Sequence, residues 1–122
     1  MYNLDNSYGF DEKRPGWGLP IHQMLVENNA SVVFRGHDHL FVKQERDNIV
    51  YQLVPWPGAP KDPRGSAKLF GYTQGDILDS GGHLRVTVSE DKAVVDYIRA
   101  HLPRNEREGH HNGEIAYTYT IN

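Results

Sequence analysis

The chain has 122 residues and a formal net charge of −3, with acidic and basic side chains scattered along it. This length suits one domain, and the lack of a Lys/Arg-rich block argues against a nucleic-acid partner. The absence of cysteine excludes disulfides and thiolate metal sites. No apolar run reaches the length of a membrane span and no signal peptide is visible, so we expect a soluble chain of undetermined compartment and no membrane partner.

The first elements in chain order are an irregular segment, a helix and a strand. Residues 1–18 show no hydrophobic period, and we interpret them as an irregular lead-in. Pro20 predicts the start of a short helix, because proline is favoured at the first helical position. One apolar stripe follows at helical spacing: Ile21, Met24 and Leu25. Asn28-Asn29 suits the helix end, and residues 31–35 predict a buried strand.

The rest of the chain predicts strands joined mostly by short turns. Arg46-Asp47-Asn48 suits a tight hairpin between strands at 40–44 and 49–54. Residues 55–68 contain four prolines and are expected to form a long loop. Further strands are expected at 82–89, 93–100 and 114–121, with a polar loop at 101–113. The expected fold class is α+β, mostly antiparallel sheet with one short helix.

The most informative segment is Gly36-His37-Asp38-His39, directly after the first expected strand. Neutral imidazole is the commonest metal ligand among side chains, and glycine lets the backbone turn tightly. On an extended backbone the two imidazoles would lie on one side and Asp38 on the other. The pattern therefore predicts His37 and His39 as metal ligands, with Asp38 able to orient an imidazole. The alternative is two incidental histidines at an exposed turn.

The run at 32–39, VVFRGHDH, resembles the last Gly-His-x-His block of the calcineurin-like metallophosphoesterases. The context is similar too, with a helix before the strand, a hairpin after it, and a late strand at 80–88, SGGHLRVTV. The resemblance extends from about Arg14 to Ile98. It implies the C-terminal part of a four-layer sandwich that holds two metals between its sheets.

This resemblance implies a hydrolase, a phosphatase acting on a phosphoester substrate at a dinuclear site. Carried onto this chain, it implies that His37 binds the second metal and His39 the first. Zn, Fe or Mn suits such ligands, and the sequence does not choose among them.

The family's earlier blocks, Asp-x-His, Gly-Asp-x-x-Asp and Gly-Asn-His-Asp/Glu, do not occur in this sequence. His22 lies at the flank of the short helix and is not equated with the family's lone histidine. We therefore interpret residues 1–122 as a single domain that is a fragment of a larger fold, weakly active or inactive alone. No catalytic residue is assigned. We expect a homo-oligomer, or pairing with the missing N-terminal part, because open sheet edges attract other strands.

Two other classes of protein remain as alternatives. A non-catalytic β-rich module would self-associate or bind a partner. A cupin-type mononuclear metal enzyme would use His-x-His, a glutamate and a His-x-x-x-Asn pattern. Glu45, His101 and Asn105 mimic that set, but Glu45 lies too far along the chain from His39.

Several single residues carry weaker expectations. Trp56, between two prolines, is either a rigid substrate platform or a hydrophobic plug, and we favour the plug. Arg35 is expected to pair with a local acid rather than with phosphate. His110-His111 is expected in a solvated turn, and Tyr117 and Tyr119 in the core or an interface.

Overall fold

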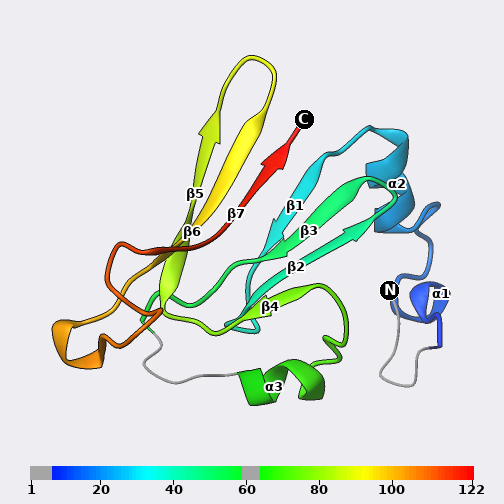
Figure 1. Cartoon of the computed structure of the whole chain (residues 1–122). Coiled ribbons are helices and arrows are strands. Elements are labelled where there is room, and N and C mark those ends of the chain that lie inside the picture. Colours follow the sequence, from blue (N-terminus) through cyan, green and yellow to red (C-terminus); the bar gives the residue numbers. More distant parts are fainter. Residues whose placement is uncertain (1–6, 59–63) are drawn as a thin grey trace. The chain divides into compact units, whose positions relative to one another are not determined.

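The computed structural model describes residues 7–58 and 64–122, and it divides into two compact units, Met1–Ala30 and Ser31–Asn122. The first unit contains two helices, α1 (Phe10–Lys13) and α2 (Ile21–Glu27). The second unit contains, in chain order, β1 (Val32–Arg35), β2 (Phe41–Arg46), β3 (Ile49–Leu53), α3 (Arg64–Leu69), β4 (Asp76–Leu78), β5 (Gly82–Val88), β6 (Ala93–Arg99), the 3-10 helix η1 (Pro103–Asn105) and β7 (Ile115–Ile121) (Figure 1).

Helix α2 confirms the predicted helix. Pro20 occupies its N-cap position and Asn28 its C-cap. Asn29 follows in the left-handed region at φ 53°, which asparagine tolerates better than most residues. The expected irregular lead-in also contains α1, a single turn of helix.

The second unit contains a four-stranded sheet in the order β1-β3-β2-β4. The predicted hairpin joins β2 to β3, and its turn residues Asp47 and Asn48 have φ of 50° and 62°, as a type I′ turn requires. Strand β1 is parallel to β3 and lies at the sheet edge. The expectation that residues 31–35 form a buried strand is therefore wrong: Phe34 is 41 % exposed, because an edge strand has a neighbour on one side only.

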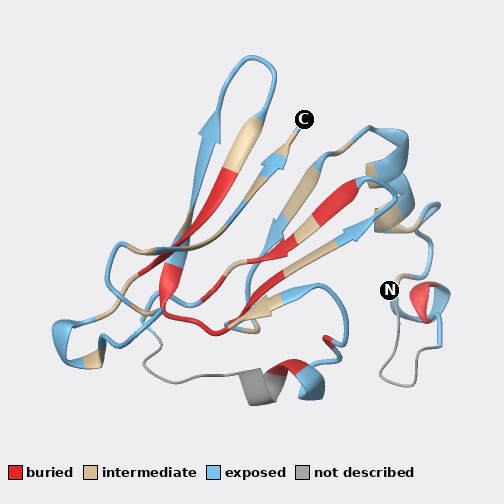
Figure 2. Ribbon diagram, viewed as in Figure 1, coloured by how far each residue is buried: buried red, intermediate tan, exposed pale blue. Residues whose placement is uncertain are grey.

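The second sheet has the antiparallel order β5-β6-β7, and all three strands were predicted. Figure 2 shows that burial concentrates on the central strands of both sheets, notably β3 and β6. The turn between β5 and β6 is closed by the main-chain N–H of Ser89, which donates to the carbonyl of Lys92.

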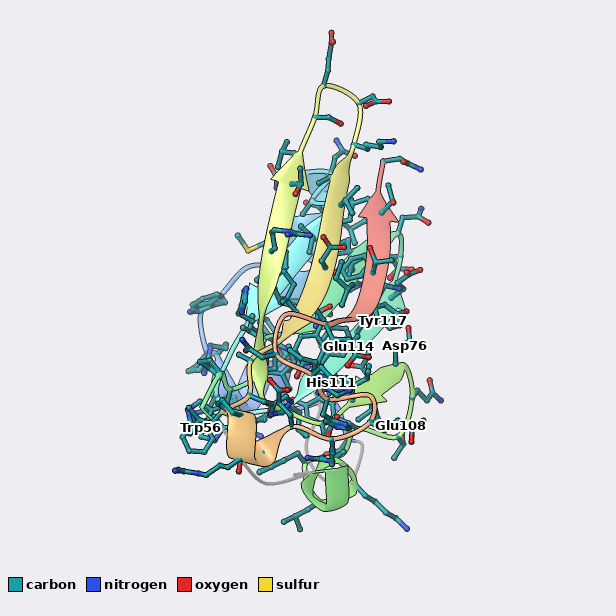
Figure 3. All side chains as sticks on the ribbon, turned by 60° about the vertical axis from the view of Figure 1, so that its left-hand side comes forward. Trp56, Asp76, Glu108, His111, Glu114 and Tyr117 are labelled. Carbon is teal, nitrogen blue, oxygen red and sulfur yellow. The ribbon has the colours of Figure 1, made fainter. Side chains whose placement is uncertain are left out.

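The two sheets pack through aromatic side chains. Phe41 on β2 stacks on Tyr97 of β6 at 4.8 Å between ring centroids and contacts Tyr117 of β7 at 5.3 Å. Tyr117 is partly buried at this contact between the sheets, and Figure 3 shows its side chain beside that of Asp76, whose carboxylate accepts its hydroxyl hydrogen bond. Such ring pairs add about 0.5–1.5 kcal/mol beyond the area that they bury.

Helix α3 packs against the opposite face of the four-stranded sheet through Ala67. A buried cluster lies there: Leu40, Val42, Leu53, Ala67 and Tyr72. Helix α3 corrects the prediction that residues 55–68 form one long loop, of which residues 59–63 lie outside the described part. The α+β class with mostly antiparallel sheet is confirmed, but the expected count of one helix is wrong.

Candidate functional site

The loop at residues 36–39 joins β1 to β2 and has an unusual backbone. His37 and His39 both lie in the left-handed region, at φ of 95° and 60°. Gly36 does not, and a Cβ added to it would meet no atom within 4 Å. The expectation that Gly36 provides the tight turn is therefore wrong, because the conformation that favours glycine falls on the two histidines. Each such residue costs of the order of 1–3 kcal/mol unless its surroundings hold it in place.

Both histidine side chains are exposed, and the His39 ring packs on Trp56 at 4.7 Å between ring centroids. Among the described residues, no hydrogen bond to either imidazole is present. Their ring nitrogens can therefore accept a metal. The described part of the chain nevertheless places no group of three or more His, Asp or Glu side chains in position to hold one. His101, which a cupin site would require here, contacts His110 instead, at 5.6 Å.

Asp38 is held by a tyrosine. The Tyr72 hydroxyl donates a hydrogen bond to its carboxylate, and the Arg35 guanidinium lies over the Tyr72 ring at 5.3 Å. Burial, aided by the hydrogen bond to Asp38, raises the pKa of Tyr72 to about 12, so the phenol stays protonated as the donor. Within the described residues, Arg35 thus makes a cation–π contact rather than the expected ion pair.

Ser80 supports the other end of the loop. Its buried hydroxyl donates to the main-chain carbonyl of His39 and accepts the main-chain N–H of Trp56 at 3.2 Å. The N–H of Gly81 donates to the Trp56 carbonyl at 3.1 Å. One serine side chain therefore fixes both His39 and Trp56, and nothing in the sequence pattern marked it.

Trp56 is 48 % exposed, so the favoured interpretation of it as a hydrophobic plug is wrong. Its main chain is fixed on both sides by Ser80 and Gly81, and Pro55 and Pro57 flank it. Figure 3 shows Trp56 at the periphery, beside the 3-10 helix η1. The ring is a half-exposed surface next to His39 on a main chain that is held in place.

A second polar cluster begins one residue before Ser80. This Asp79 cluster comprises Asp79, Tyr97, Arg99, Arg107 and His110. Arg99 bonds one carboxylate oxygen of Asp79 at 2.7 Å, and Nε2 of His110 bonds the other at 2.6 Å. The expectation of a solvated turn is therefore wrong for His110, whose side chain is only 18 % exposed.

The Asp79 carboxyl has a pKa below its ordinary value. Burial alone would raise that pKa, but hydrogen bonds from His110 and Arg99, and their charges, outweigh the desolvation. The Tyr97 hydroxyl and Arg99 also donate to the main-chain carbonyl of Asp79, at 2.7 and 2.9 Å. The described polar groups of Asp79 are thus fully paired inside the cluster.

No family model matches the chain, and comparison with curated proteins and solved structures found no significant similarity. Within the described residues, no helix is both long and apolar enough to cross a membrane. Evidence for function therefore comes from the loop geometry and from the resemblance of residues 32–39.

Proposed function

We propose that this chain is the C-terminal part of a metal-dependent phosphoesterase of the calcineurin-like type, with His37 and His39 as metal ligands. The observation that carries the proposal is the 36–39 loop, where both histidines have left-handed backbones and exposed, unbonded rings. Strain of this kind persists at sites where function needs a particular geometry. Gly36, which would tolerate this conformation most easily, does not adopt it.

The donor set fits a divalent transition metal in part. Two neutral imidazoles suit Zn, Fe or Mn, but a catalytic site needs at least one further ligand. The remaining ligands would come from outside the described residues, from a preceding part of the same protein. When bound, the metals would supply Lewis acidity and an activated water for phosphoester hydrolysis. We expect the chain alone to hydrolyse phosphoesters weakly or not at all.

The role of this chain's own residues is to hold the loop in shape. Tyr72 fixes Asp38 in the middle of the loop, and Ser80 fixes the His39 carbonyl at its end. These contacts come from two separate segments of the chain. A binding site held on several sides loses less entropy when its ligand arrives, which is how preorganised sites gain affinity.

Metal binding by the purified chain tests the proposal. Titration with Zn²⁺ and Mn²⁺, followed by elemental analysis, should show binding that falls at least about tenfold in His37→Ala and in His39→Ala. His83→Ala is the matched control, since His83 is an exposed histidine on β5 outside the loop. Equal metal binding by all four proteins, or none by the wild type, would exclude His37 and His39 as the site.

A second function, self-association, is supported by exposed apolar side chains on β5. Val86 is 45 % and Val88 75 % exposed, and β5 is an edge strand. Edge strands with apolar faces pair with other chains unless they are covered. We therefore propose a homo-oligomer or pairing with another part of the protein. Light scattering that gives a strict monomer at high concentration would contradict the homo-oligomer.

A further inference from the structure

We propose that Trp56 and the pocket beside it bind the alcohol part of the substrate, and that this part carries a flat aromatic ring. The inference rests on the proposed function, because it names the substrate class of the same site. Trp56 would be a stacking platform next to the metal-binding loop.

The first step is the place of the ring. The Trp56 indole and the His39 imidazole are 4.7 Å apart between centroids, with an angle of 32° between their planes. A phosphoester held at His37 and His39 would lie beside the indole, close enough for its alcohol part to contact the ring. The exposed half of Trp56 is the apolar surface that such a group would meet.

The second step is rigidity. The main-chain N–H and carbonyl of Trp56 are both bonded, to Ser80 and Gly81, and the flanking prolines restrict the backbone. A restrained main chain and a ring packed on His39 leave less entropy to be lost when a ligand ring stacks on the indole. A tryptophan that only filled space under a loop would be buried, and this one is 48 % exposed.

A pocket of about 720 Å³ lies beside the Trp56 loop and is lined by Pro57, Gly58, residues 100–105 and Asn112. A Cβ added to Gly58 would lie 3.8 Å from Nε1 of Trp56, so the indole and this wall adjoin. Arg104 also lines the pocket, and within the described residues its guanidinium makes no ion pair. The pocket thus lies next to the indole and has hydrogen-bond donors in its lining, which together suit an aryl or heteroaryl alcohol bearing polar substituents.

The test compares phenyl phosphate with cyclohexyl phosphate, which has a ring of similar size that is not flat. Both are titrated into the whole chain in metal-free buffer by ligand-observed NMR, so that the outcome does not depend on metal binding. We expect phenyl phosphate to bind roughly tenfold more tightly, the advantage that stacking supplies. Trp56→Leu should remove that advantage, and Trp56→Phe, which keeps a ring, should retain most of it.

Trp17→Leu is the matched control, because Trp17 is the other tryptophan and is equally exposed, at 50 %. It should bind both ligands as the wild type does. In Trp17→Phe, where Trp56 is the only tryptophan, phenyl phosphate should shift the indole emission. Equal binding of the two phosphates, no binding of phenyl phosphate, or an unchanged preference in Trp56→Leu would each overturn the inference. Failure of the metal titration instead, with the ring preference intact, would overturn the proposed function alone.

Discussion

The Asp79 cluster and the 36–39 loop are anchored by adjacent residues, Asp79 and Ser80, yet they differ in burial, charge pairing and backbone strain. The centre of the Asp79 cluster is buried, and the Asp79 carboxylate is bonded at short distance to Arg99 and His110. The 36–39 loop, which Ser80 holds, is exposed, strained and carries two imidazoles without partners in the described residues. Both carboxylate oxygens of Asp79 are bonded within the protein, whereas the exposed imidazoles of the 36–39 loop keep ring nitrogens that a ligand could use. This difference is consistent with a structural role for Asp79, and it supports the proposal that His37 and His39 bind a metal.

The largest effect should come from Asp79→Ala. Removing this carboxylate leaves Arg99, whose side chain is only 4 % exposed, as an uncompensated buried charge. Breaking such a pair costs about 3–5 kcal/mol, measured as the free energy of unfolding in urea. Asp96→Ala is the control, since the Arg85 partner of Asp96 is half exposed, and its loss should be smaller. Equal losses in the two variants would remove the distinction between a buried and an exposed pair.

Asp79 should also contribute to acid unfolding. Its folded-state pKa lies below the ordinary carboxyl value, so its contribution to stability is complete above the unfolded-state pKa of about 3.9. That contribution is lost as the pH falls through the lower, folded-state pKa. Asp79→Asn should therefore unfold with a shallower pH dependence below about pH 4 than the wild type, in urea titrations. The same pH dependence of the free energy of unfolding in wild type and Asp79→Asn would show that other carboxyl groups cause the acid unfolding.

Ser80→Ala should have the next largest effect. It leaves the carbonyl of His39 and the N–H of Trp56 without their shared partner, which costs about 1–3 kcal/mol for partly buried groups. It should also weaken metal binding, because His39 loses its anchor. Ser89→Ala, in the exposed turn after β5, removes hydrogen bonds of a similar kind and should cost no more than about 0.5 kcal/mol. Wild-type stability and metal affinity in Ser80→Ala would show that the serine does not hold the loop.

The sequence predicted what local pattern determines. Alternating apolar residues defined β5 and β7, and turn residues placed the β2–β3 hairpin. Strand β4 has three residues, too few for a period, and α3 has no apolar stripe in its sequence RGSAKL. Local pattern also suggested burial for residues 31–35, but burial depends on how many neighbouring strands the sheet supplies.

The candidate site likewise has some features that the sequence predicted and others that it did not. His37 and His39 were found because they are close in sequence and resemble a known motif. Tyr72 lies 34 positions along the chain from Asp38, and Ser80 lies 41 positions from His39. Contacts between residues so far apart cannot be predicted from the spacing of residues in the sequence. The left-handed backbone of both histidines was also missed, since Gly36 offered the obvious place for a turn.

His37→Gly should have a smaller effect, of the opposite sign. Glycine adopts φ of 95° without the steric cost that histidine bears, and this relief exceeds its greater chain entropy when unfolded. We expect a gain of about 0.5–1 kcal/mol in thermal or urea unfolding, together with loss of metal binding. Gly36→Ala is the control and should change stability little, as the added Cβ meets open space. A destabilised His37→Gly would show that the loop is not strained at this position.

The smallest effect should be a pH dependence from His101, which lies beside the Asp79 cluster. Burial, and then the charges of His110, Arg99 and Arg107, lower its pKa below the ordinary 6.5. Its ring nitrogen Nε2 is buried without a hydrogen-bond partner in the described residues, which disfavours the protonated form. The unfolded chain therefore takes up a proton near pH 6.5 that the folded chain still excludes, so stability falls as the pH drops from about 7 toward the folded-state pKa. In His101→Gln, the free energy of unfolding in urea should decrease less over this pH range, while the main-chain N–H of residue 101 keeps its hydrogen bond to Asn112. If the free energy of unfolding falls equally in the wild type and in His101→Gln, the folded protein does not disfavour protonation of His101. The buried surroundings of Asp79 would then not extend to the His101 imidazole.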